Sequence, residues 1–432
     1  MGDKTLGTSD APLPDPEQPV SSRPAAEAFL SKICFKLGPP ALVGVEVEWI
    51  TTTADGSRPS VPTLARLLGP HAPPSVSPHS PHAPLPDGSM VSVEPGGQLE
   101  LSSQPVESVT ELRDRIDRDS AALRELLRGR IHLHSRADDK RHADQVLTVP
   151  RYRAMRGRYN NIGPLGRWMM CNTAAVQVCL DAGRDDTEVA ARWQMLHDVG
   201  PALCAAFANS PGRAGDEARS GPLSASARMR AWHGLDPVRD VPAFGAPRLD
   251  EHSPSPRIDY PRRVLATPLL CVRRGDNDWS APDITFGDWI DGNSGNLDRP
   301  PTYADLRYHA TTVFGAIRPQ GHLEVRYLDA QPPGGWLVPA AVLTALAATP
   351  QTVTEASDIA RATAGRWTDA AVDGLDDAEL RSAAASLIEL ATDLTDDCTL
   401  RSVLGRDASR VARGERPHAQ KSAPTREGAA AR

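Results

Sequence analysis

The chain has 432 residues, of which 40% are hydrophobic and 24% charged, and its formal net charge at pH 7 is −7. This length can bury the core of one large domain or two ordinary ones, and the acidic balance gives no electrostatic support for a nucleic-acid partner. No apolar run reaches the roughly 18–20 residues of a membrane-spanning helix, and the six cysteines lack Cys-x-x-Cys spacing, so we expect a cytoplasmic protein with reduced thiols.

The first ordered element is expected to be a short helix that begins at Ala25, because residues 1–24 are rich in Pro, Ser and Asp and are typical of a disordered segment. The run VGVEVEWI at residues 43–50 then alternates apolar residues with Gly and Glu, which is the period of a strand with one buried face. Glu46 and Glu48 project from the same face, roughly 6–7 Å apart along the strand. Two carboxylates held this close repel unless a cation lies between them or one is protonated.

The segment SVEPGGQLELSSQP repeats this polar signature. Glu94 precedes a Pro-Gly-Gly turn signal, and after the turn Gln98 and Glu100 face one way while the two leucines beside Glu100 face the other. Between the two glutamate segments, residues 69–89 are so rich in proline that we expect a surface loop, and we interpret the three histidines of this loop as solvated.

Helices and two more half-polar strands follow. A Ser-x-x-Glu capping box at Ser108 begins a helix, and a second helix is predicted over 187–208. One strand, NTAAVQVCLD, presents Gln177. The other, GHLEVRYLD, presents Glu324 and Arg326. Several helical stretches follow from residue 339, the clearest at 376–392, and the charged tail is expected to be frayed.

Four half-polar strands that each present a Glu or Gln favour a single sheet with a metal-binding face. Any one Glu-x-Glu pair is more simply an exposed strand face, but the recurrence favours the shared site. Oxygen donors without a His or Cys cluster indicate a hard cation such as Mg²⁺ or Mn²⁺. Magnesium usually shares its shell with substrate phosphates, so a nucleotide is the implied companion. Helices set apart from a mostly antiparallel, hairpin-fed sheet indicate an α+β fold.

Six strings of the sequence carry a family resemblance: GVEVE, EPGGQLELSS, RWMMCNTAAVQVCLDAG, FANSP, TFGDWIDG and HATTVFGAIRPQGHLEVRYLD. They resemble the glutamate–cysteine ligases of the plant and bacterial type, and most of all the actinobacterial branch that supplies γ-glutamylcysteine for ergothioneine synthesis. The resemblance implies a glutamine-synthetase-like ligase fold, in which a curved, mostly antiparallel sheet carries the active site and helices flank it. It also implies one catalytic domain over residues 25–412, with the core motifs at 41–330, a helical part at 339–412 and a disordered tail at 413–432.

The reaction implied by the resemblance uses ATP, L-glutamate and L-cysteine, with no nucleic-acid or membrane partner. The γ-carboxylate of glutamate attacks the γ-phosphate of ATP to form γ-glutamyl phosphate, and the amine of cysteine then displaces phosphate. Because the first step brings two anions together, it needs concentrated positive charge. Two or three Mg²⁺ ions, with Mn²⁺ as the alternative, would supply part of it.

Site residues are carried over by motif. The expected metal ligands are Glu46, Glu48, Glu94, Glu100 and Glu324, with Gln177 either as a neutral ligand or as a residue that supports the ligands. For Glu94 the alternative is a purely structural role in ordering the turn. Arg326 is expected to bind the nucleotide and, together with Glu324, to act in catalysis by stabilising the transferring phosphoryl group. An ion pair between Arg326 and Glu324 is the alternative reading, and the two roles are compatible.

The expected substrate-binding residues come from two segments. SARMRAWHGLDPVRD and VPRYRAM supply the following candidates: Arg228, Trp232, Arg239, Arg151, Tyr152 and Met155. Trp232 and Tyr327 are the candidate walls of a cysteine pocket. The cysteines of the chain are interpreted as core thiols, because this chemistry needs no nucleophilic thiol.

Three alternative functions remain open at this point. One is a related ligase that joins glutamate to a different amine. Another is a hydrolase with two carboxylates, which the absence of H-E-x-x-H and G-x-S-x-G motifs disfavours. The third is a non-catalytic binding module. The chain also lacks a P-loop motif, so the acidic face of the sheet is expected to hold the phosphates of ATP.

Overall fold

One antiparallel sheet forms the centre of the molecule. The computed structural model describes residues 12–163, 165–214, 223–235, 255–275 and 277–417. The strand order is β2-β3-β1-β5-β7-β6, every pair in it is antiparallel, and β4 pairs separately with the far end of β1. The strands are β1 (Val43–Thr53), β2 (Met90–Val93), β3 (Leu99–Ser102), β4 (Ile131–His134), β5 (Ala175–Asp181), β6 (Ile317–Pro319) and β7 (His322–Asp329). The predicted α+β class with a mostly antiparallel sheet is confirmed.

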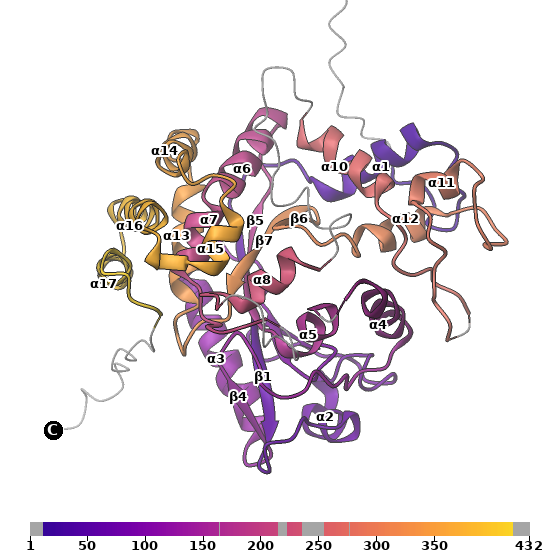
Figure 1. Ribbon diagram of the computed structural model, residues 1–432, viewed down its shortest axis with the longest axis horizontal. Coiled ribbons are helices and arrows are strands. Elements are labelled where there is room, and N and C mark those ends of the chain that lie inside the picture. Colours follow the sequence, from indigo (N-terminus) through magenta and orange to yellow (C-terminus); the bar gives the residue numbers. More distant parts are fainter. Residues whose placement is uncertain (1–11, 164, 215–222, 236–254, 276, 418–432) are drawn as a thin grey trace, which may run out of the picture.

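The apolar face of the sheet is covered by helices. α3 (Val109–Leu127) packs on β1, α13 (Leu337–Leu346) on β5, and α7 (Gly200–Ala206) on β7. The alternating residues predicted to face inward are buried, because each strand places every second side chain against these helices. α16 (Ala378–Asp393) and α17 (Cys398–Ala412) pack outside this layer, and Figure 1 shows them together with α13 at one end of the molecule.

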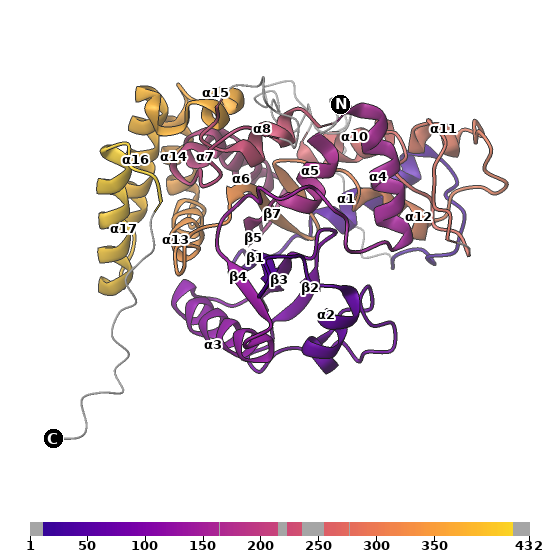
Figure 2. The same ribbon diagram turned by 60° about the horizontal axis from the view of Figure 1, so that its bottom comes forward.

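The opposite face, which carries the polar residues, lies beneath three other helices. α5 (Leu165–Asn172) packs against both α4 (Pro150–Ile162) and α8 (Ala227–His233), and α8 also touches β7. Figure 2 shows α4 and α5 on one side of the strands and α3 on the other. The two faces of the sheet therefore have different roles. One packs into the core, and the other is covered by helices that can enclose a ligand.

The remaining helices complete the shell: α1 (Arg23–Cys34), α2 (Val61–Leu68), η1 (Gly69–His71), α6 (Asp186–Asp198), α10 (Pro256–Ala266), α11 (Phe286–Ile290), α12 (Tyr303–Ala310), α14 (Pro350–Ala360), α15 (Trp367–Val372) and η2 (Gly374–Asp376). Of the helices in the described ranges, none alone has the length and hydropathy to cross a membrane. Only α13 and α14 taken together are long and apolar enough, and this pair is bent by 112° at the break between the two helices.

Three local predictions need correction. The described part of the N-terminal segment, residues 12–24, is tied to the fold: Val20 is buried and its N–H donates to the Pro301 carbonyl at 2.9 Å. α1 also begins two residues before Ala25, because the hydroxyl of Ser22 accepts from the backbone as an N-cap. Disorder up to residue 24 is therefore wrong for this part.

The helix predicted over 187–208 is two helices, since α6 ends at Asp198 and α7 begins at Gly200. Pro201 has no N–H to continue the ladder of α6, so the chain changes direction there. In the proline-rich loop, ring nitrogens of His71 and His82 hydrogen-bond to the carbonyls of Ala83 and Val91 at 2.9 and 2.8 Å. These two histidines fasten the loop, so their interpretation as solvated side chains was wrong.

Candidate active site

The polar residues of four strands meet on one face of the sheet. In the strand register Glu48 is opposite Glu100, Glu46 is opposite Gln177, and Glu324 is opposite Cys179. Because side chains alternate along a strand, these residues point to the same side of the sheet. The structure therefore brings together the residues that the repeated half-polar pattern singled out.

Neutral donors hold two of these carboxylates. Glu48 accepts from the Ala175 N–H at 2.8 Å and from Gln177 Nε2 at 3.0 Å. The same Gln177 nitrogen lies 3.3 Å from a Glu100 oxygen, and the Ser92 hydroxyl donates to the other Glu100 oxygen at 2.5 Å. Gln177 thus bridges two glutamates that would otherwise repel each other.

Glu324 differs from the other glutamates because it has two arginine partners. Arg318 on β6 donates to both of its oxygens, at 2.8 and 2.9 Å, and Arg326 forms an ion pair with it and also donates to the Gln177 carbonyl. Sequence reasoning missed Arg318. It sits in the string IRPQGHLEVR, but only the pairing of β6 with β7 places it opposite Glu324.

Burial and mutual repulsion shift the acidity of this face. Burial, reinforced by the charge of Glu100, raises the pKa of Glu48 to about 8 and that of Glu94 to about 7. Burial also raises the pKa of Glu46, reinforced by Glu100 and Glu324, and that of Glu100, reinforced by Glu324. Burial would also raise the pKa of Glu324, but the two arginines outweigh it and hold that pKa below its usual range. Four carboxyl groups therefore lack enough positive charge to ionise readily.

This donor set fits divalent metal ions. Oxygen ligands whose ionisation is held back for want of a cation are the groups that Mg²⁺ would bind and deprotonate. Within the described ranges, however, no group of three His, Cys, Asp or Glu side chains already stands in a geometry that could hold an ion. The bridge from Gln177 to Glu48 and Glu100 must open before those two carboxylates can share a cation.

The turn that carries Glu94 is packed directly against the end of α5. A Cβ atom on Gly96 would lie 2.1 Å from the Cys171 carbonyl oxygen, so only glycine fits there. Arg58 donates to the carbonyls of Gly96 and Cys171, both at 2.9 Å, and clamps the turn to the helix. Sequence reasoning missed Arg58, because nothing in its local sequence distinguishes it from a surface arginine.

A cavity of about 120 Å³ lies between the acidic face and the helices above it. Seven of the predicted site residues line this cavity: Glu48, Glu94, Tyr152, Met155, Arg228, Trp232 and Arg326. Burial and the charge of Glu94 raise the pKa of Tyr152 well above its usual value, so it lines the cavity as a neutral phenol. Further wall residues, which sequence reasoning did not assign to the site, include Gln98, Tyr159, Met169, Met170, Leu235 and Phe314. The apolar walls suit a small side chain, and the polar edge borders the carboxylates.

Arg228 supports a bulge in β7. The register between β5 and β7 shifts at Val176/Val178, so that Arg326 and Tyr327 together stand opposite Gln177. The Arg228 guanidinium donates to the Arg326 carbonyl at 2.9 Å and the Leu328 carbonyl at 3.3 Å. Beside the bulge, the guanidinium carbons of Arg228 and Arg326 each lie 5.3 Å from the centre of the Trp232 ring. This arrangement fixes the direction of Arg326.

Not every candidate for substrate binding lines the cavity. Arg151 does not line the cavity, because its guanidinium donates to the hydroxyl and carbonyl of Thr311, both at 2.9 Å. Tyr327 does not line the cavity either, and its hydroxyl donates to the Leu196 carbonyl at 3.2 Å. Arg239 lies outside the described residues.

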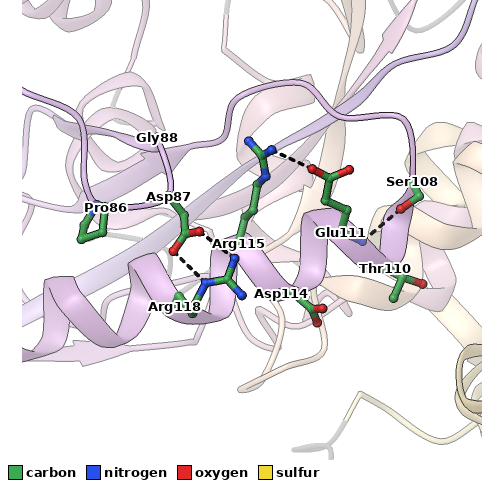
Figure 3. Close-up of a pocket in the computed structure, with 9 residues that line it drawn as sticks. All are labelled: Pro86, Asp87, Gly88, Ser108, Thr110, Glu111, Asp114, Arg115 and Arg118. Atoms are coloured by element: carbon green, nitrogen blue, oxygen red, sulfur yellow. Dashed lines mark hydrogen bonds and ion pairs between the residues drawn. The ribbon is translucent and has the colours of Figure 1, made fainter.

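A larger hollow of about 740 Å³ lies along α3, away from the acidic face. Figure 3 shows two ion pairs among its charged side chains: Asp87 with Arg118, and Glu111 with Arg115 at 2.7 Å. It shares no lining residue with the smaller cavity. Size alone therefore does not identify the active site.

An antiparallel sheet with carboxylates and arginines on one roofed face is the arrangement that the sequence motifs led us to expect of a ligase. Residues 42–416 match the family model described as glutamate-cysteine ligase family 2 (GCS2). The chain belongs to this family, and the family predicted from the sequence motifs is confirmed.

Individual relatives agree with this assignment. The chain is 36% identical to "Glutamate--cysteine ligase EgtA" of Mycobacterium tuberculosis over 395 residues, which cover 88% of this chain and 85% of the relative. It is 33% identical to the protein of the same name from Mycolicibacterium smegmatis over 391 residues, 89% and 87% of the two chains. The chloroplastic glutamate–cysteine ligase of Arabidopsis thaliana is 28% identical over 254 residues, 56% of this chain and 46% of that one.

One solved structure shares the fold. The glutamate–cysteine ligase of Francisella tularensis in complex with AMP superimposes with a TM-score of 0.51, covering 87% of this chain and 82% of that chain. Its sequence identity is only 12%, so the likeness concerns the fold alone. The predicted ligase fold is confirmed by this comparison.

Proposed function

We propose that this protein joins the γ-carboxylate of L-glutamate to the amine of L-cysteine at the expense of ATP, giving γ-glutamylcysteine. Family membership over residues 42–416 and the identity to two mycobacterial ligases over most of both chains support this activity. The single observation that carries the proposal is the acidic face itself, where five glutamates and two arginines gather and three of them, Glu48, Glu94 and Arg326, line a small cavity.

The chemistry explains why such a face is needed. A free carboxylate does not condense with an amine, so its oxygen must first become part of a leaving phosphate. Attack of the glutamate γ-carboxylate on the γ-phosphate of ATP brings two anions together, and that encounter requires fixed positive charge. Arg326, aimed by the β7 bulge, and Arg318 beside it are the chain's own cations at this place.

Divalent ions would supply the rest of the charge. We propose that Glu46, Glu48, Glu94 and Glu100 hold two or three Mg²⁺ ions, with Mn²⁺ as a substitute, and that Gln177 and Glu324 complete the set. Bound Mg²⁺ would neutralise the triphosphate and polarise its γ-phosphate. The raised pKa values of Glu48 and Glu94 support this role, because these carboxyls gain most from a nearby cation.

The cavity would receive the amino-acid substrates. Arg228 and Trp232 belong to its α8 wall, and Tyr152 and Met155 belong to its α4 wall. Methionine and aromatic walls suit a thiol side chain, because sulfur makes favourable contacts with both. Arg228 would act mainly by holding β7 in place, since its donors are already used on backbone carbonyls.

The pathway is the finer part of the proposal. The two mycobacterial relatives carry the same name, EgtA, and the sequence resembles the ergothioneine branch of the family. We therefore propose that γ-glutamylcysteine made here enters ergothioneine synthesis in the cytoplasm. Deleting the gene should abolish ergothioneine in cell extracts, measured by mass spectrometry, and added γ-glutamylcysteine should restore it.

Release of ADP tests the activity. The purified protein is incubated with ATP, Mg²⁺ and L-glutamate, alone and with a panel of amines, and the product is identified by mass spectrometry. Cysteine should stimulate ADP release far more than serine, alanine or 2-aminobutyrate, and the product should be γ-glutamylcysteine. Stimulation by another amine, with none by cysteine, would favour a related carboxylate–amine ligase instead.

A further inference from the structure

The walls of the cavity contain three polar atoms that are buried without a hydrogen-bond partner among the described residues. They are Oε1 of Gln98, Nε1 of Trp232 and Nε of Arg326. Gln98 and Trp232 are only 2% and 3% exposed, so water cannot readily satisfy them. Three such atoms around one cavity are unusual, because the great majority of buried polar groups in proteins are paired.

The orphan atoms form a complementary set. Trp232 Nε1 and Arg326 Nε are donors, whereas Gln98 Oε1 is an acceptor. A carboxylate accepts from donors and an ammonium group donates to an acceptor, so this combination matches the two charged groups of an α-amino acid. Leaving a buried donor or acceptor unpaired is unfavourable, and a ligand that pairs them gains that free energy on binding.

The orientation of the Gln98 amide is determined by its other end. Nε2 of Gln98 donates to the carbonyls of Thr173 at 2.9 Å and Met170 at 3.3 Å, at the end of α5. A flipped amide would place an oxygen against both carbonyls, so Oε1 is the atom left for a ligand. The backbone of Gln98 is held as well, since its carbonyl accepts from the Glu94 N–H at 2.9 Å.

We propose that Gln98 is a substrate-recognition residue whose Oε1 accepts a hydrogen bond from the α-ammonium group of L-glutamate. This inference rests on the proposed function. The amine of cysteine must be free to attack the acyl phosphate, whereas the α-ammonium of glutamate must stay charged and apart from it. A neutral carbonyl acceptor can hold that ammonium group while the neighbouring carboxylates remain available for metal ions. The flexible side chains of Met169 and Met170 can move aside as the ligand enters the cavity.

Calorimetric binding tests the proposal with two ligands that differ only in the amino group. Dissociation constants of L-glutamate and glutarate are measured in the presence of Mg²⁺ and a non-hydrolysable ATP analogue. Gln98→Met keeps the length of the side chain but removes the acceptor. We expect the preference of the wild type for glutamate over glutarate to fall about 10- to 100-fold in this variant, because a hydrogen bond to a charged group is lost. The affinity for the nucleotide analogue should not change.

Gln145→Met is the matched control. Gln145 also has a buried Oε1 without a partner among the described residues, but it does not line the cavity. Its substitution should leave the glutamate preference intact. If the ratio of the dissociation constants for glutamate and glutarate is the same in Gln98→Met as in the wild type, the proposal is wrong, even if both ligands bind more weakly.

A folding defect of Gln98→Met, seen by circular dichroism, would shift the test to the wild type and N,N,N-trimethyl-L-glutamate, which keeps the positive charge but has no N–H to donate. This ligand should bind no more tightly than glutarate, and binding as tight as that of L-glutamate would contradict the proposal. The proposed function and the role of Gln98 can be refuted independently. A wild-type protein that releases no ADP with glutamate and cysteine refutes the proposed function, whereas an active wild type with an unchanged ratio in Gln98→Met refutes only the role of Gln98.

Discussion

Glu48 and Glu100 face each other directly across β1 and β3, and the single Nε2 of Gln177 bridges them at 3.0 and 3.3 Å. A neutral amide thus stands where two buried carboxylates would otherwise need a cation. Burial raises the pKa of both groups, with the charge of Glu100 adding to the effect on Glu48 and that of Glu324 to the effect on Glu100. A divalent ion that displaces the amide would therefore favour the ionised form of the pair. The predictions below follow from this arrangement and from the elements that hold it.

Without metal ions, the protein should lose stability as the pH rises from about 5 to about 8. The pKa of Glu48 is about 8 and that of Glu94 about 7 in the fold, against an ordinary value of 4.5. In this window the folded state binds more protons than the unfolded chain, so the free energy of unfolding falls as pH rises. Thermal midpoints measured with EDTA across this range check the slope.

Added Mg²⁺ should reverse this loss, and by more at pH 8 than at pH 6, because the ligands must be deprotonated to bind. Glu48→Gln removes one of the shifted carboxyls and should flatten the slope of the metal-free protein. A midpoint that rises steadily with pH in EDTA would contradict the shifted pKa values.

Replacing Arg326 by Met should lower kcat by about 10³-fold, the effect typical of an arginine that stabilises a transferring phosphoryl group. Arg318→Met should also lower kcat, because both guanidiniums are fixed by Glu324. Arg115→Met serves as the control, since Arg115 pairs with Glu111 on the surface of α3. Steady-state ADP release compares the three, and near-wild-type turnover in Arg326→Met would remove the assigned role.

Gly96→Ala should abolish activity and destabilise the protein. The added methyl group would come within 2.1 Å of the Cys171 carbonyl oxygen, so the turn must leave α5 and carry Glu94 away from the site. Gly38→Ala is a suitable control, because the space around Gly38 is open. Activity and thermal midpoints of both variants provide the comparison, and wild-type activity in Gly96→Ala would show that this close contact does not matter.

Arg228→Met should reduce the free energy of unfolding by about 3 kcal/mol, because it leaves a buried carboxylate without its ionic partner. That carboxylate is Asp329, whose oxygen lies 3.7 Å from Arg228 and whose remaining bonds come from neutral donors such as Ser210 and Ser226. Urea unfolding monitored by tryptophan fluorescence measures the change. An effect below about 0.5 kcal/mol, the range of surface substitutions, would rule out this supporting role.

The sequence predicted the strands that carry the site because a one-sided strand has a period of two, which is visible in a single sequence. The shared face of Glu46, Glu48, Glu100 and Glu324 followed from that period and from the recurrence of the pattern. The break after α6 was harder to predict, because the apolar period continues through Val199 and only Pro201 marks the change.

Other features depend on contacts between distant segments, and local patterns do not report these. Arg318 becomes a partner of Glu324 only through the pairing of β6 with β7, and Arg58 reaches Cys171 across more than a hundred residues. The alternation in the sequence places Tyr327 with Leu323 and Val325 rather than with Glu324 and Arg326, but only the packed structure shows that its hydroxyl bonds to the Leu196 carbonyl. Gln98 was placed on the correct face, but its unpaired oxygen is a property of the packed cavity.

Binding of Mn²⁺ followed by electron paramagnetic resonance tests the central claim most directly, with the wild type compared with Glu48→Gln/Glu100→Gln in the presence of a non-hydrolysable ATP analogue. The amides keep the shape of both side chains but remove the negative charges that should hold the ions. The wild type should bind Mn²⁺ tightly and Mg²⁺ should displace it, whereas the folded double variant should lose most of this binding. Equal Mn²⁺ binding by the two proteins would contradict a metal site on the acidic face of the sheet.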